Sequence, residues 1–252
     1  RKKLGWHTFE IHLNCLQHLS DMLRENEWKV TATVVKDRNG YRILKIDPLD
    51  TTAHNYGVAI DVGTTTVVDI NSWEVVGVEG THNMQASYGE DVISRMIYAC
   101  GKGGLHPLHE AVVKNINQLI EKLAGEHSIP LDEINIIVAA GNTTMGHFLL
   151  GLTPCSIRLD PYVPTADVYP PILAKDIGIH IHPNGVLETI PNVASYVGGD
   201  IVAGVMSCGI PDSPQVKGLI DIGTNGEIAI GNNEWLVCCS ASAGPAFEGG
   251  GT

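Results

Sequence analysis

The chain has 252 residues, 44% of them hydrophobic, and a formal net charge of −12 at pH 7. This length and apolar content are sufficient for one large or two ordinary globular domains with a buried core. The acidic balance would repel a polyanion and no stripe of Lys or Arg offsets it, so nucleic acid is excluded as an expected partner.

The sequence shows no pattern typical of a membrane span, a signal peptide or a cysteine-based metal site. No apolar run is as long as a membrane span, and the basic start, RKKLGWHTFEIHLN, lacks the apolar stretch and cleavage site of a signal peptide. We therefore expect a cytoplasmic protein with no membrane partner. The six cysteines show no C-x-x-C or ligand spacing, which predicts neither a disulfide framework nor an iron–sulfur site in this chain, and Cys238 and Cys239 are expected to be small buried residues.

The first fifty residues read as a small α+β unit. Helical spacing of apolar residues extends over 9–25, and alternation on both sides of Asn39-Gly40 predicts a β-hairpin. The polar stretch 47–56 marks a boundary. Because the chain begins without Met and stops in a glycine-rich turn, we expect a piece of a longer protein.

After the boundary, short strands over 57–80 predict an antiparallel meander. Helices are expected at about 89–99 and 107–124, followed by a buried strand at INIIVAA and a turn and helix at GNTTMGHFLLGL. The proline-rich stretch 153–192 predicts an irregular excursion. A small-residue helix then places Asp200 in its first turn, and LIDIGTNGEIAI begins a second meander.

One turn occurs twice. Asp61, Gly63 and Thr64 end the first apolar strand, and Asp221, Gly223 and Thr224 end a later one. Glycine lets a hairpin corner approach a ligand closely, hydroxyl and N–H donors suit phosphate oxygens, and a carboxylate suits hydrated Mg²⁺. A single copy is more often an ordinary turn. Two copies favour a clamp on a nucleotide's phosphates, and the absence of G-x-x-x-x-G-K-[ST] disfavours a P-loop NTPase.

With these turns in view, the chain resembles the superfamily of actin, sugar and acetate kinases and Hsp-type chaperones. The resemblance is closer to one family, the ATP-dependent reductive activators of corrinoid proteins (RACE). Six segments carry it in the family's order: YGVAIDVGTTTV, NMQASYGEDVISRM, AAGNTTMGHFLLG, YVGGDIVAG, LIDIGTNGEIAIGN and CSASAGPAFEGG.

The resemblance implies an α/β fold: an actin-like (ribonuclease H-like) ATPase lobe with a small N-terminal α+β domain. Residues 1–52 would be most of the family's middle domain. Residues 53–215 would be the first lobe, including the irregular stretch 153–192. Residues 216–252 would begin a truncated second lobe, which leaves ATP binding by this piece alone in question.

The resemblance also implies an activity. ATP and Mg²⁺ would drive the return of a Co(II) corrinoid on a partner protein to Co(I), with electrons from a [2Fe–2S] cluster in an N-terminal domain outside this chain. The partner would be a corrinoid protein, and a homodimer is left open. The rivals are a small-molecule kinase of the same superfamily and a non-catalytic nucleotide-sensing module, because the phosphate clamp is common to all three.

Several residues receive expected roles beside plainer alternatives. Asp61 and Asp221 would orient Mg²⁺ through water, and Asp200 would orient or deprotonate the attacking water unless it merely suits a helix N-terminus. The expected phosphate contacts are Gly63, Thr64, Thr65, Thr66, Asn142, Thr143, Gly223, Thr224, Asn225, Gly226 and Glu227.

The alternatives for these contacts are specific. Thr66 would be a core strand residue more readily than Thr64 or Thr65, Asn142 with Thr143 would simply cap a helix, and Glu227 would be solvated. Ser240 or Ser242 would face a corrin ring. The alternative is that their segment forms a second phosphate loop or a tight packing corner. Glu90 and Asp91 would only cap a helix, or Asp91 and Arg95 would form an ordinary surface pair, and His180 and His182 are expected to be surface residues of a strand.

Overall fold

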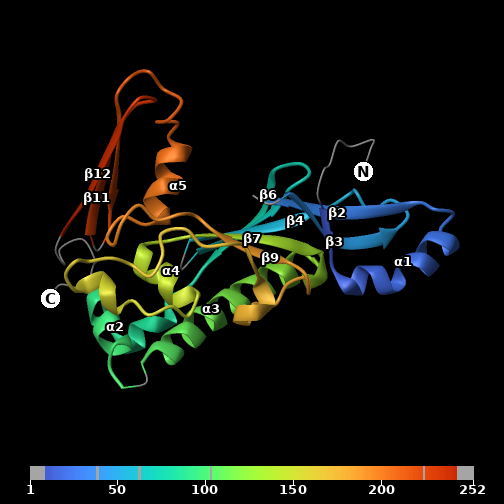
Figure 1. Ribbon diagram of the computed structural model, residues 1–252, viewed down its shortest axis with the longest axis horizontal. Helices are drawn as coiled ribbons and strands as arrows, with labels where there is room; N and C mark the ends of the chain where they lie inside the picture. The colour runs from blue at the N-terminus through green and yellow to red at the C-terminus, as the bar shows by residue number, and fades with distance from the viewer. Residues whose placement is uncertain (1–8, 38–39, 62–63, 103, 224, 243–252) are drawn as a thin grey trace.

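The computed structural model describes residues 9–37, 40–61, 64–102, 104–223 and 225–242 of the chain (Figure 1). The N-terminal unit consists of β1 (Phe9–Ile11), α1 (Leu13–Glu25), β2 (Val30–Asp37) and β3 (Gly40–Pro48). Its sheet has the order β1-β3-β2, with β2 and β3 antiparallel, so the hairpin predicted at Asn39-Gly40 is confirmed by the strands on either side of it.

A six-stranded sheet forms the centre of the molecule, in the order β6-β5-β4-β7-β9-β8. Its first three strands, β4 (Tyr56–Asp61), β5 (Thr64–Asp69) and β6 (Glu74–Gly80), are the predicted antiparallel meander. β7 (Ile134–Ala140) lies parallel to β4, and their register pairs Asp61 with Ala140. The carboxyl ends of these two strands therefore lie at the same edge of the sheet.

Helices cover one face of this sheet. α3 (Leu105–Glu126) packs against it and is joined by η1 (Met84–Tyr88), α2 (Val92–Ala99) and α4 (Thr143–Leu149) (Figure 1). Apolar side chains of α3 pack with the inward side chains of the strands to form the main core, which includes Val58, Val67, Val112, Ile120 and Ile137. Burial of these aliphatic groups is the main force that fixes the sheet on its helices.

The predicted irregular excursion contains regular structure. Upstream of it lies η2 (Leu131–Glu133), and within it lie η3 (Cys155–Arg158), β8 (Ile172–Leu173), η4 (Ala174–Ile177) and β9 (Val186–Thr189). β9 pairs in parallel with β7 and lies between β7 and the edge strand β8. The prediction of an irregular stretch over 153–192 is therefore wrong at β8 and β9.

α5 (Gly199–Ser207) is the predicted small-residue helix, and it packs against a separate antiparallel sheet of β10 (Lys217–Ile222), β11 (Asn225–Gly231) and β12 (Leu236–Ser242). This sheet and α5 stand at the end of the molecule opposite to the N-terminal unit (Figure 1). The second meander is thus confirmed, with Asp221 near the end of β10.

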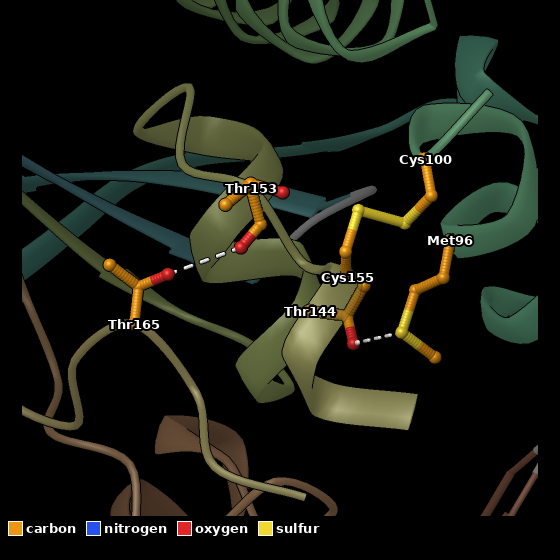
Figure 2. Close-up of a disulfide and its surroundings, with 6 residues drawn as sticks. All are labelled: Met96, Cys100, Thr144, Thr153, Cys155 and Thr165. Carbon is orange, nitrogen blue, oxygen red and sulfur yellow. Dashed lines mark hydrogen bonds between the residues drawn. A yellow bond between two sulfur atoms is a disulfide. The ribbon is translucent and has the colours of Figure 1, made fainter. Parts of the chain in front are cut away.

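A disulfide joins Cys100, which follows α2, to Cys155 at the start of η3 (Figure 2). The two Cα atoms are 5.7 Å apart although the residues are 55 positions apart in sequence. The expectation that the chain encodes no disulfide is wrong for this pair, because packing between α2 and η3 and not local spacing brings the sulfurs together. Cys239 is exposed and Cys238 half-buried, so the expectation that both are buried is also wrong.

The pairing predicts a simple labelling pattern. Iodoacetamide in denaturant without reductant should modify the four free thiols, Cys15, Cys208, Cys238 and Cys239. After reduction with dithiothreitol, iodoacetamide should also modify Cys100 and Cys155. In the Cys100→Ser variant, Cys155 should become reactive without reductant. Peptide mass spectrometry reads out each site, and labelling of all six cysteines before reduction would contradict the disulfide.

Candidate functional site

Four carboxylates come together from three separate parts of the chain. Asp61 ends β4, Asp200 lies in the first turn of α5, and Asp221 and Glu227 lie directly opposite each other on β10 and β11. Burial raises the pKa of Asp200, and the negative charges of Asp61 and Asp221 raise this pKa further. The structure therefore brings together the three aspartates that the sequence singled out.

Glu227 belongs to the same group. Burial raises its pKa, and the charges of Asp200 and Asp221 add to the effect. Ser240 lies opposite Glu227 on β12, and its hydroxyl donates to Glu227 Oε1 at 3.1 Å, which acts in the opposite direction on this pKa. The half-buried Glu227 is therefore not simply solvated, and the hydroxyl of Ser240 is engaged within the sheet.

The corner between β4 and β5 places Thr64 directly opposite Asp61 in the ladder. Thr64 is exposed beside this carboxylate, whereas Thr65 is completely buried and Thr66 is half-buried. Among the described residues, Thr65 Oγ1 has no hydrogen-bond partner. The expectation that Thr66 is the core residue of the three is wrong, because the inward positions of β5 are Thr65, Val67 and Asp69.

The turn between β7 and α4 uses its polar side chains within the fold. Asn142 caps α4, with Oδ1 accepting from the Met145 N–H at 2.9 Å, and the buried Thr143 donates its hydroxyl to the Ala194 carbonyl at 2.6 Å. Thr144 Oγ1 lies 3.6 Å from Met96 Sδ (Figure 2). Capping and packing thus account for these side chains, and contact of Asn142 or Thr143 with phosphate stays a prediction.

Two glycines let α5 begin close to this turn. A Cβ on Gly198 would lie 2.4 Å from Asn142 Cα, and one on Gly199 would lie 2.6 Å from the Ile190 carbonyl oxygen. The Asp200 N–H donates to the Gly141 carbonyl at 3.3 Å, and the Gly199 N–H donates to Asn192 Oδ1 at 3.2 Å. Asp200 is therefore held at the carboxyl edge of the central sheet by the backbone of its own helix.

Several of the remaining predicted phosphate contacts lie outside the described residues. Gly63 and Thr224 lie outside the described residues, as do the side chains of Asn225 and Ser242. Gly223 is exposed at the β10–β11 corner, and Gly226 pairs with Ile222. Within the described ranges, no three or more His, Cys, Asp or Glu side chains are arranged to hold a metal ion.

Two side clusters differ from expectation. Arg95 is 9% exposed, and its guanidinium donates to the carbonyls of Gly89 at 2.8 Å and Glu90 at 3.1 Å, so the surface pair with Asp91 is wrong. Asp91 caps α2, which confirms the other interpretation of this residue. His182 is buried just before a turn and does not lie on a strand surface.

Sequence reasoning missed Asn192, whose side chain holds the start of α5. It lies just beyond β9 in the proline-rich stretch, where no periodicity or spacing marks it. Only the three-dimensional contact with Gly199 reveals its position at the site.

Comparison with known proteins shows the family of this chain. Residues 56–213 match the family described as the RACo middle region, residues 215–252 match the C-terminal domain of RACo, the ASKHA domain, and residues 1–53 match the RACo linker region. The corrinoid activation enzyme RamQ of Eubacterium limosum is 36% identical over 202 residues, which are 78% of this chain and 34% of RamQ.

A solved structure, a reductive activator for corrinoid, iron-sulfur protein, is 41% identical and superposes with a TM-score of 0.90. The match covers 97% of this chain and 40% of that one, so this chain spans well under half the length of either relative.

The fold and the family matches thus define a mixed α/β chain in which residues 215–252 match an ASKHA domain. The chain belongs to the RACo family of corrinoid activators, which confirms the family resemblance found in the sequence. The family gives the name linker to residues 1–53 and the name middle region to residues 56–213, which differs from the naming inferred above. None of the helices in the described part of the chain is long and apolar enough to cross a bilayer.

The close approach at Gly198 predicts a strong effect of a single methyl group. Gly198→Ala should push α5 away from Asn142 and lower the free energy of unfolding by about 1–3 kcal/mol, measured by urea denaturation. The matched control is Gly125→Ala in α3, where a Cβ meets nothing within 4 Å and should stabilise the helix by up to about 1 kcal/mol. Equal stability of Gly198→Ala and the wild type would contradict the packing described here.

Proposed function

We propose that this chain is part of an ATP-dependent reductive activator that returns the Co(II) corrinoid of a partner protein to Co(I). The observation that supports this most directly is the convergence of Asp61, Asp200 and Asp221 at one edge of the central sheet in a chain of the RACo family. The names of the two relatives, a corrinoid activation enzyme and a reductive activator, point to the same activity.

The acidic site suits a nucleotide that arrives with a divalent cation. Burial raises the pKa of Asp200 and two neighbouring carboxylates raise it further, so a bound cation would relieve the repulsive part of this effect. We assign Asp61 and Asp221 to orient Mg²⁺ through its bound waters, since this ion keeps several waters and takes few protein ligands. Bound Mg²⁺ would neutralise phosphate charge.

The other residues have matching roles in this proposal. Asp200 is placed to orient or deprotonate the water that attacks the terminal phosphate, because burial and its neighbours favour its uptake of a proton. Thr64, exposed beside Asp61, would donate to phosphate oxygens, and Glu227 would help to position the cation's waters. Residues 53–215 would form the first lobe around ATP and residues 216–252 the beginning of the second.

The electron for cobalt comes from outside this chain in this proposal. One electron converts Co(II) to Co(I), and the family resemblance implies a [2Fe–2S] cluster in an N-terminal domain as its source. The partner is a corrinoid protein, the compartment is the cytoplasm, and a homodimer remains an open prediction.

The test follows the visible spectrum of a Co(II) corrinoid protein in the presence of the full-length activator and a chemical reductant. ATP should accelerate the loss of the Co(II) spectrum, and Asp221→Asn should reduce the ATP-dependent rate by about a hundredfold because a preorganised charge is lost. Asp21→Asn, at an exposed position on α1, is the matched control and should leave the rate unchanged.

Equal rates with and without ATP across candidate corrinoid proteins would contradict the proposal. Phosphate transfer to a sugar or to acetate without a corrinoid protein would identify a kinase instead. Partner binding that survives Asp61→Ala and Asp221→Ala, with no hydrolysis by the wild type, would identify a sensing module.

A further inference from the structure

A chain of polar side chains connects α4 to the start of α5. It begins at His147 on α4, which is completely buried, continues through Tyr169, and ends at Asn192, which is also buried. None of these residues is one of the acidic groups described above, and all three come from segments outside the repeated turns. Their contacts nevertheless end one residue away from Asp200.

The contacts of His147 fix its tautomer. Nε2 lies 3.0 Å from the Thr165 nitrogen, and since this N–H can only donate, Nε2 carries no proton. Burial lowers the pKa of His147, which favours the neutral ring with its proton on Nδ1. Nδ1 is 2.8 Å from the Thr143 carbonyl oxygen and 3.1 Å from Tyr169 Oη, so its N–H is directed at both acceptors.

Tyr169 and Asn192 continue this order of donors and acceptors. Burial raises the pKa of Tyr169 to about 12, so its phenol stays protonated at neutral pH. Asn192 Nδ2 donates to Tyr169 Oη at 3.2 Å, and Asn192 Oδ1 accepts from the Gly199 N–H at 3.2 Å. Because the Gly199 N–H can only donate, the orientation of the Asn192 amide is determined at both ends.

The contact to Gly199 replaces a helix cap. The first N–H groups of a helix have no partner within the helix, and they are commonly satisfied by the side chain of the N-cap residue. The N-cap of α5 is Gly198, which has no side chain, because a Cβ there would collide with Asn142. Asn192 supplies the missing acceptor from a neighbouring segment, and its own N–H is tied to the Asp167 carbonyl at 2.8 Å.

We propose that Asn192 and Tyr169 are positioning residues that fix the first turn of α5, and with it the place of Asp200 relative to Asp61 and Asp221. This inference rests on the proposed ATP-hydrolysing function of the site. His147 acts one step further away, since it holds Tyr169 Oη in the position that Asn192 needs.

Tyr169→Phe is the sharpest variant, because it removes one oxygen and keeps the ring that packs at 81° to His147. In the full-length protein, kcat for ATP hydrolysis should fall about five- to tenfold, as expected for one lost hydrogen bond in the network, while KM for ATP changes by less than about twofold. The matched control is Tyr162→Phe, since Tyr162 is 51% exposed and should tolerate the change.

Substitutions of Asn192 separate hydrogen bonding from packing. Asn192→Leu keeps the approximate volume but removes the acceptor, and kcat should fall at least as far as in Tyr169→Phe. Asn192→Asp keeps an oxygen for the Gly199 N–H, and the Tyr169 hydroxyl can turn to donate to its second oxygen, so kcat should recover to within about threefold of the wild type. A role in volume alone would leave kcat of both variants close to that of the wild type, and this result would contradict the proposal.

Hydrogen exchange of the backbone amides at 199–202 provides a readout that does not depend on ATP hydrolysis. Exchange there should be faster in Tyr169→Phe and Asn192→Leu than in the wild type and Tyr162→Phe. Faster exchange together with the fall in kcat supports the proposal. Unchanged exchange would show that Tyr169 and Asn192 do not fix the first turn of α5. Faster exchange with unchanged kcat would show that fixing this turn does not matter for Asp200.

If the wild type hydrolyses no ATP, the proposed function fails, and the assignment to catalysis fails with it. The exchange data still show whether Asn192 and Tyr169 fix the first turn of α5, since they report on this helix directly.

Discussion

Burial of the Asp200 carboxylate beside Asp61 and Asp221 is the constraint on which the rest of this site depends. Burial and two neighbouring charges raise the pKa of Asp200, so the ionised group is less stable there than in water. Three elements that are distant in sequence nevertheless bring these groups to one edge of the sheet. The packing of the fold must therefore supply the free energy that the convergence costs, which is typical of a site that binds a cation or transfers a proton.

Close contacts around the start of α5 hold Asp200 in this place. The sheet and α3 form a rigid aliphatic core behind the site, and the β7–α4 turn is tightened by the Asn142 cap. Gly198 and Gly199 allow α5 to approach the neighbouring backbone closely, because a Cβ at either position would collide with it. Asn192 then satisfies the Gly199 N–H, so the acidic residue lies on a helix whose position is determined by backbone contacts on two sides.

Local patterns in the sequence predicted the elements that carry the three aspartates. Asp61 and Asp221 lie at the ends of apolar strands, and Asp200 lies at the start of a helix of small residues. They failed where the outcome depends on contacts between distant segments. β9 has four residues among prolines, and only its pairing with β7 makes it a strand. The partner of Cys100 is 55 residues away, and the inward position of Thr65 follows from the register of β5. Asn192 has no sequence signal at all.

The most direct test of this account is the pH dependence of the free energy of unfolding for the wild type and Asp200→Asn. The folded-state pKa of Asp200 is above its unfolded value, so its penalty is absent below the ordinary pKa of an aspartate, grows as pH rises through the folded pKa, and is complete above it. The amide side chain of the variant is never charged, and its oxygen can still accept from the Ile201 N–H as the carboxylate does. The account therefore predicts that Asp200→Asn is more stable than the wild type at neutral pH and that this advantage disappears in acid. Equal or lower stability of the variant at neutral pH, or an advantage that does not change with pH, would contradict it.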